Sequence, residues 1–169
     1  MVSLFALDHN FPTPIVDALV GFQADARLVR IDKIDRRMPE LDDWELLLAL
    51  HHHAEPWDGL ITTDSSMLNQ GPEVAALIQT KLTLVVAMDA GHNPVKASGL
   101  LFAHLAAISQ RTRPDVPQLW QLRAVARPHQ KPWDCVTRIA EHNDRDTQNF
   151  WKEAKRTEAQ MATDPLAAV

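Results

Sequence analysis

The chain has 169 residues, of which 46% are hydrophobic and 23% charged, a composition typical of a folded globular protein and not of a disordered chain or a fibre. This length suits one domain with a sizeable core and is short for two. The formal net charge of −5 argues against a nucleic-acid binder that relies on overall positive charge. It leaves room for a metal-dependent one whose acidic centre recruits cations.

Cysteine content and hydropathy indicate the cellular setting. The single Cys135 excludes an internal disulfide and a cysteine-rich zinc site, which favours a reducing compartment. Residues 1–11 lack the basic leader of a signal peptide, and the apolar run at residues 82–88 is too short to span a bilayer. We therefore expect a cytoplasmic protein with no membrane association.

The N-terminal part of the chain predicts a strand, a helix and a second strand. Residues 2–7 are apolar and end at Asp8, and Thr13-Pro14 suits the cap and first position of a helix over residues 14–20. Residues 26–31 alternate as a second strand does. Residues 32–41 then form a charged connection, which contains Arg36 and Arg37 and is expected to be exposed.

A helix is predicted from residue 43 to about residue 53. Asp42 and Glu45 have the spacing of a capping pair, which gives Asp42 a structural role. Asp43 instead stands at the leading end of the apolar stripe that contains Leu46, Leu47, Leu50 and Ala54. We therefore expect the Asp43 carboxylate to face the sheet, near the strand ends.

Residues 59–66 begin as a buried strand and end in hydroxyls and a carboxylate, Thr62, Asp64 and Ser65. A helix over residues 72–78, a strand over residues 82–88 that ends at Asp89, and a helix over residues 95–109 follow. This alternation predicts an α/β fold with parallel strands and right-handed crossovers. In such sheets ligands bind beyond the carboxyl ends of the strands.

The composition changes at residue 111, where prolines become frequent. We predict an α/β core over residues 1–110 and an extension over residues 111–169 that packs on it. The extension contains a strand over residues 119–125 and one or two helices over residues 133–161, with a weak point at residues 143–144. Its Phe150-Trp151 face is expected to mediate association with another molecule.

Asp8, Asp43 and Asp64 are predicted to converge at the carboxyl edge of the sheet. Each has an ordinary alternative reading, as a loop residue or as an acid favoured at a helix N-terminus. Three converging carboxylates would repel one another unless a cation or raised pKa values compensated. Oxygen ligands favour Mg²⁺ or Mn²⁺, and the matching chemistry is hydrolysis of a phosphodiester bond.

Three stretches resemble the PIN-domain and PIN-like nucleases, which include the toxin ribonucleases of bacterial toxin-antitoxin pairs. Leu7-Asp8-His9-Asn10-Phe11-Pro12 is similar to the opening Asp-x-Asn turn of a short PIN-like subgroup. Asp43-Trp44-Glu45-Leu46-Leu47-Leu48-Ala49 resembles the aspartate that starts a helix in this family, and Leu60-Ile61-Thr62-Thr63-Asp64 resembles its strand ending in Thr-x-Asp. The resemblance runs from about Leu4 to Ile108 and does not cover the last third of the chain.

The resemblance implies a three-layer α/β/α PIN-like fold with a mainly parallel sheet, here followed by a C-terminal helical extension. It implies that Asp8, Asp43 and Asp64 ligate Mg²⁺ or Mn²⁺ and cleave RNA, and that Thr62 positions a ligand or water. Many PIN nucleases have a further acid between the first and third carboxylates, for which Glu40 and Asp42 are candidates here. Our candidate RNA contacts are Asn10, Thr62, Ser65, Arg36 and Arg37.

The expected function is thus a Mg²⁺- or Mn²⁺-dependent ribonuclease, in one version a toxin with a cognate antitoxin. The alternative is a catalytically inactive PIN-like module that binds RNA or a protein. A phosphoryl-acceptor domain or phosphatase is a third reading, but Asp8-His9-Asn10 lacks the second aspartate of such a nucleophile turn. The expected partners are RNA, an antitoxin protein and a second copy of the chain.

Two other groups of residues carry weaker signals. His51, His52 and His53 follow one another, so on a helix their side chains diverge by about 100° and are poorly placed for one metal ion. A second set of basic residues suggests a phosphate-binding edge, although charged runs are usually solvated faces: Arg111, Arg113, Arg123, Arg127 and Lys131.

Overall fold

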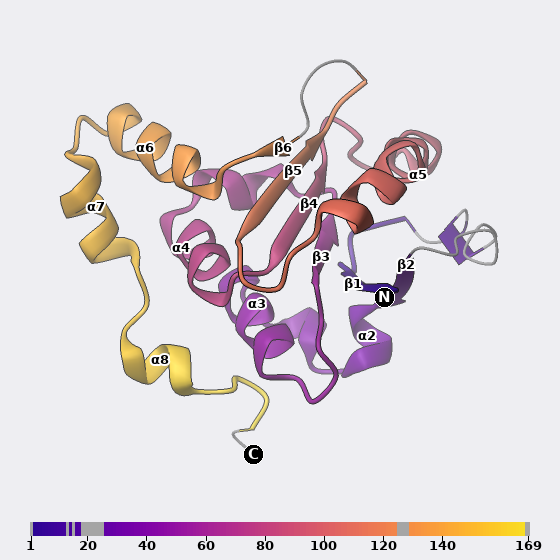
Figure 1. The fold of residues 1–169 in the computed structure, drawn as a ribbon, viewed down its shortest axis with the longest axis horizontal. Coiled ribbons are helices and arrows are strands. Elements are labelled where there is room, and N and C mark those ends of the chain that lie inside the picture. The colour runs from indigo at the N-terminus through magenta and orange to yellow at the C-terminus, as the bar shows by residue number, and fades with distance from the viewer. Residues whose placement is uncertain (1, 13, 15, 18–25, 125–128, 168–169) are drawn as a thin grey trace.

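The computed structural model describes residues 2–12, 14, 16–17, 26–124 and 129–167. The protein has an α/β fold built on one six-stranded sheet, in the order β2-β1-β3-β4-β5-β6 (Figure 1). The strands are β1 Ser3–Leu7, β2 Ala26–Arg30, β3 Gly59–Thr62, β4 Thr83–Ala87, β5 Gln118–Leu122 and β6 His129–Gln130. Strands β1 to β5 are parallel to one another, and β6 alone is antiparallel to its neighbour β5.

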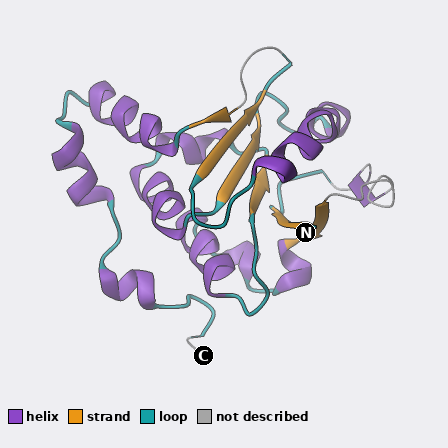
Figure 2. Cartoon of the chain, in the orientation of Figure 1, coloured by secondary structure: helices purple, strands orange, loops and turns teal. Residues whose placement is uncertain are grey.

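Helices cover both faces of this sheet (Figure 2). The described residues contain the α-helices α2 Ile31–Ile34, α3 Asp43–His52, α4 Gly71–Thr80, α5 Pro94–Arg111, α6 Pro132–His142, α7 Thr147–Ala154 and α8 Glu158–Ala162. Short 3-10 helices are η2 Met38–Glu40 and η3 Ser65–Asn69. In Figure 1, α3, α4 and α6 lie on one side of the sheet and α5 on the other. The expected mainly parallel sheet flanked by helices is confirmed in this general form.

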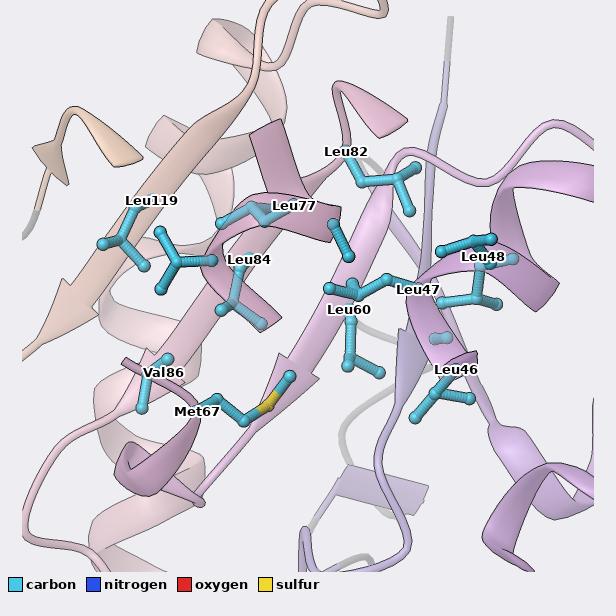
Figure 3. Packing of buried hydrophobic residues seen from close by; sticks show 14 of the residues in the cluster. Leu46, Leu47, Leu48, Leu60, Met67, Leu77, Leu82, Leu84, Val86 and Leu119 are labelled. Carbon is cyan, nitrogen blue, oxygen red and sulfur yellow. The ribbon is translucent and has the colours of Figure 1, made fainter. Parts of the chain in front are cut away.

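Two apolar cores follow from the alternation of side chains along the strands. Leu60 and Leu84 point toward α3 and α4, where they join the cluster shown in Figure 3. Their neighbours Ile61 and Val85 point the other way, into a cluster with Leu101 of α5. Every residue of β1, β3, β4 and β5 is buried, as expected for parallel strands that are covered on both faces.

Several predicted boundaries differ from the observed ones. Ile31 begins α2 instead of continuing β2, and the connection after it is not fully exposed, because Met38 is buried in η2. The expected helix over residues 14–20 and the end of the strand predicted over residues 119–125 lie partly outside the described residues. The short strand β6 had no counterpart in the prediction.

The C-terminal extension packs against α4. Residues 133–161 form three helices and not one or two, with breaks after His142 and after Ala154. Phe150 of α7 approaches Gly71 so closely that a Cβ at position 71 would lie 2.9 Å from the Phe150 ring. Trp151 stacks edge-on against Trp133 of α6, with ring centroids 5.3 Å apart. Both aromatic residues are therefore partly buried against the core, so the face that we expected to mediate association is only partly open.

The parallel strands give the sheet two distinct edges. The carboxyl edge is where β1 and β3 end, and α3 and α4 begin there because they run back against the strand direction. The amino edge is where β5 starts, and there α5 ends and α6 begins. In the described part of the chain, no helix is both long and apolar enough to cross a membrane.

Candidate functional site

Asp8 occupies the turn directly after β1 and is almost fully buried, with 3% of its surface exposed. Its backbone N–H donates to the Ile61 carbonyl of β3 at 2.9 Å, so the turn is fastened to the neighbouring strand. The Asp8 Oδ1 atom lies 2.8 Å from Nδ1 of His9, whose side chain is half exposed. A buried carboxylate at a strand end, in contact with a half-exposed imidazole, is therefore the first feature of the candidate site.

Thr62 connects Asp8 to Asp64. The buried Thr62 hydroxyl donates to Asp8 Oδ2 at 2.7 Å and accepts from the Asp64 backbone N–H at 2.9 Å. The Asp64 Oδ1 atom in turn accepts from the Ser66 N–H at 2.8 Å, which caps η3. Strand β3 and the turn after it therefore hold two of the three predicted acids in one hydrogen-bonded unit.

Asp43 opens α3 from a third segment of the chain and is half buried. Burial raises the pKa of its carboxyl, and the negative charges of Asp8 and Asp64 raise that pKa further. His9 acts in the opposite direction. Asp43 thus experiences the charges of both other predicted acids, which agrees with the expected convergence at the carboxyl edge. As predicted, the neighbouring Asp42 caps α3, and its N–H donates to Glu45 Oε2 at 3.1 Å.

Glu73 is a further acid at this edge that the sequence reasoning missed. It lies in the first turn of α4, is 7% exposed, and its Oε2 atom has no hydrogen-bond partner in the described structure. Burial raises the pKa of the Glu73 carboxyl, and the charge of Asp43 adds to the effect. A pocket of about 380 Å³ is lined by Glu73, Asp42 and Asp43. A glutamate in a first helical turn is so common that the sequence gave no reason to select it.

The C-terminal extension reaches this acidic pocket through Arg156. Its guanidinium carbon lies 5.5 Å from the ring centroid of Trp44, which lines the pocket beside Asp43. The positive charge of Arg156 lowers the pKa of Glu73 against the dominant effect of burial. Residues beyond position 111 therefore border the site.

The other predicted contacts are less closely tied to the acids. Asn10 is exposed, and its backbone carbonyl accepts from the Thr63 hydroxyl at 3.3 Å. Ser65 begins η3 and is partly buried, and Arg36 is exposed. Arg37 is engaged elsewhere, since it pairs with Asp35 at 2.8 Å and donates to the Leu166 carbonyl at 2.9 Å. A phosphate would have to compete with these bonds for Arg37.

Asp8, Asp43 and Asp64 offer carboxylate oxygens, which are the ligands that hard divalent cations prefer. The charges of Asp8 and Asp64 add to burial in raising the pKa of Asp43, and a bound cation would offset this repulsion. The site does not form a closed cage: among the described residues no group of three His, Cys, Asp or Glu side chains is close enough to hold a metal ion. Mg²⁺ is commonly held by one or two carboxylates and retains several waters. The fit is therefore to an ion bound partly through water.

No protein-family profile, curated protein or solved structure matches this chain.

Proposed function

We propose that this protein is a Mg²⁺- or Mn²⁺-dependent ribonuclease with a PIN-like three-layer fold, and that Asp8, Asp43 and Asp64 form its metal site. The observation that carries the proposal is the link between Asp8 and Asp64 through the Thr62 hydroxyl, and the raised pKa of Asp43, due first to burial and then to the charges of those two acids, supports it. Three separate segments bring carboxylates to one edge of the sheet, and their mutual repulsion does not stabilise the fold. A binding site for cations explains why such repulsion is tolerated.

The residues of the chain have separate tasks in this proposal. A bound divalent ion supplies positive charge for the phosphate and lowers the pKa of a water molecule. Asp8 and Asp64, linked by the Thr62 hydroxyl, would ligate the ion, and Asp43 would hold it through a bound water. The half-exposed His9 contacts Asp8 with Nδ1 and presents the rest of its ring to RNA.

The proposed RNA contacts of the surrounding surface are Asn10, Ser65, Arg36 and Arg37. The proposal includes a cytoplasmic setting, which the buried free thiol of Cys135 supports. A toxin role, with an antitoxin as partner, and a homodimer belong to the same proposal.

The test is cleavage of end-labelled single-stranded RNA with MgCl₂ or MnCl₂, compared with EDTA. Asp8→Asn, Asp43→Asn and Asp64→Asn should each lower the rate roughly 100-fold or more, the scale on which loss of one charge-stabilising group acts. Asp144→Asn is the matched control, because Asp144 is exposed and has the left-handed backbone that asparagine also accepts. A Mn²⁺-dependent rise in Tm that the three variants lose and the control keeps would report metal binding directly.

A second candidate is a PIN-like module that binds RNA or a protein without cleaving it. Two observations favour it: both Asp8 oxygens already have partners, and the described acids form no closed group of three. Wild-type protein that binds RNA, gains no stability from either metal and leaves every RNA intact would establish this function instead of the first.

A further inference from the structure

A pocket of about 640 Å³ opens at the amino edge of the sheet, opposite the acids. It lies where α5 ends at Arg111, β5 begins at Gln118 and α6 begins at Pro132. Its volume is in the range of sites that hold small organic molecules. The acidic residues discussed above do not line it.

All described charged residues that line this pocket are positively charged. Arg111, Arg113 and Lys131 line it, and none of the described lining residues is an Asp or a Glu. In the described part of the chain, neither Arg113 nor Lys131 takes part in an ion pair, although the protein carries a net charge of −5. Unpaired cations gathered around a concave surface attract an anion.

The pocket also has an apolar wall suited to a flat ring. Val116 is 41% exposed there, beside Pro117 and Trp133. The Trp133 ring is fixed by its edge-on contact with Trp151, at 5.3 Å between centroids, so it offers a preformed surface. Planar heterocycles bind on such surfaces by stacking.

Polar groups at the pocket are arranged by bonds to the sheet. Gln130 Oε1 accepts from Gln121 Nε2 at 3.0 Å, which leaves the Gln130 amide N–H groups as donors. His129 packs edge-on against the buried ring of Trp120, with centroids 5.1 Å apart. Arg111 lies over the same ring, 6.0 Å from its centroid. Gln130 and His129 thus rest on the β5-β6 strand pair, while Arg111 lies over Trp120 of β5.

We propose that this pocket binds a nucleoside phosphate, either as a free nucleotide or as one unit of a single-stranded polynucleotide. Arg113 and Lys131 bind the phosphate, while Val116, Pro117 and Trp133 contact the base. Charge-assisted bonds to phosphate and stacking of the base are the two elements of sequence-independent recognition of single strands. This site does not depend on the ribonuclease proposal, because it lies at the other sheet edge and uses none of its residues.

The experiment is isothermal titration of the wild-type protein, in EDTA, with AMP, ADP, inorganic phosphate, adenosine and a short single-stranded RNA. The Arg113→Glu/Lys131→Glu variant should weaken binding of the nucleotide or the RNA by about tenfold or more, since two charge-assisted contacts become repulsive. The Lys152→Glu/Lys155→Glu variant is the matched control, because it makes the same change of charge at exposed positions of α7 and the loop after it. That control should bind within about twofold of wild type.

Each outcome bears on the proposal. Loss of AMP and ADP binding in the double variant supports a free nucleotide as the ligand, and loss of RNA binding alone supports a polynucleotide strand. Equal affinity for inorganic phosphate and AMP would show that Val116, Pro117 and Trp133 do not contact the base. Equal weakening of binding in both double variants would show that the pocket is not the binding site. Arg113→Gln/Lys131→Gln is the substitute if charge reversal prevents folding. Asp8→Asn should retain binding, whether or not the protein proves to be a ribonuclease.

Discussion

The two edges of this sheet have opposite electrostatic character although they are built on the same strands. At the carboxyl edge, Asp43 and Glu73 have pKa values raised by burial and by neighbouring acids. At the amino edge, Arg113 and Lys131 line a pocket without a described carboxylate in its wall. The formal net charge of −5 therefore does not predict the local charge at either edge of the sheet.

The two edges also differ in how their side chains are held. At the carboxyl edge the buried Asp8 and Thr62 side chains are hydrogen-bonded to each other, and Thr62 has no exposed surface. Around Arg113 the cations stand in solvent over an apolar floor. Under the two proposals, the first arrangement would bind a cation with little reorganisation, and the second would bind an anion that carries a planar ring.

The largest loss of stability is expected from a substitution that disrupts the sheet, because both edges depend on it. A Cβ at Gly59 would lie 1.9 Å from the Thr83 carbonyl oxygen of β4, a contact that only backbone movement can relieve. Gly59→Ala should therefore lower the free energy of unfolding by roughly 3–5 kcal/mol and abolish both metal and nucleotide binding. Chemical denaturation measures the loss.

The control is Gly99→Ala in α5, where a Cβ would meet no atom within 4 Å. This change should raise stability by up to about 1 kcal/mol, because alanine is the better helix former. A Gly59→Ala protein as stable as wild type would show that β3 and β4 do not approach as closely as described.

The second effect concerns the carboxyl edge alone. Thr62→Val keeps the shape of the side chain but leaves Asp8 Oδ2 and the Asp64 N–H without their shared hydroxyl. The variant should lose about 1–3 kcal/mol of stability and its Mn²⁺-induced rise in Tm, while nucleotide binding at the amino edge persists. Thr62→Ser restores the hydroxyl and should recover both properties. Equal behaviour of the two variants would remove Thr62 from the site.

Strands β1 and β3, which carry the acids of the candidate site, could be predicted from the sequence. Their apolar runs stop at polar residues. Strands β1 and β3 end close to Asp8 and Asp64 as expected, and the cap at Asp42 placed α3 correctly. These features are local, so a short stretch of sequence determines them. Their relative position follows from the parallel sheet, for which strand-helix alternation is a sufficient signal.

The missed features depend on contacts between distant segments. Glu73 belongs to the acidic edge only because α4 packs beside α3, and nothing in residues 71–78 indicates its burial. Phe150 packs on Gly71 across 79 positions of sequence, and the residues around Phe150 do not indicate this contact. The sequence did suggest Arg111, Arg113 and Lys131 as part of a phosphate-binding edge, but the pocket that they line forms only because the end of α5 and the starts of β5 and α6 meet.

A smaller effect is expected from removing the charge of Glu73. The folded carboxyl has a pKa above its ordinary value of 4.5, so the folded state loses stability as pH rises through that raised pKa. Glu73→Gln should therefore raise Tm at pH 8 by about 2–4 °C, which corresponds to about 1 kcal/mol for a domain of this size. The gain should vanish below the ordinary pKa, where both states are protonated. Asp144→Asn should show no such pH dependence, and a gain that persists in acid would point to packing instead of charge.

The smallest effect is expected at Arg37, a cation that already has a partner, in contrast to Arg113 and Lys131. Side-chain and backbone hydrogen bonds from Arg37 hold the pKa of Asp35 at about 2, below its ordinary value of 3.8. Because the folded carboxyl is the stronger acid, this pair stabilises the protein above pH 3.8 and loses its contribution as pH falls toward 2. The pair is partly exposed to solvent, so Asp35→Asn should lower Tm at pH 7 by no more than about 2 °C. The Tm difference from wild type should shrink both in acid and in 0.5 M NaCl, as expected for a screened surface pair. Asp35→Asn also frees the Arg37 guanidinium from its ion pair, while the bond from Arg37 to the Leu166 carbonyl remains. If RNA then binds more tightly to this variant than to wild type, Arg37 belongs to the substrate surface. If the RNA affinity is unchanged, Arg37 does not belong to it.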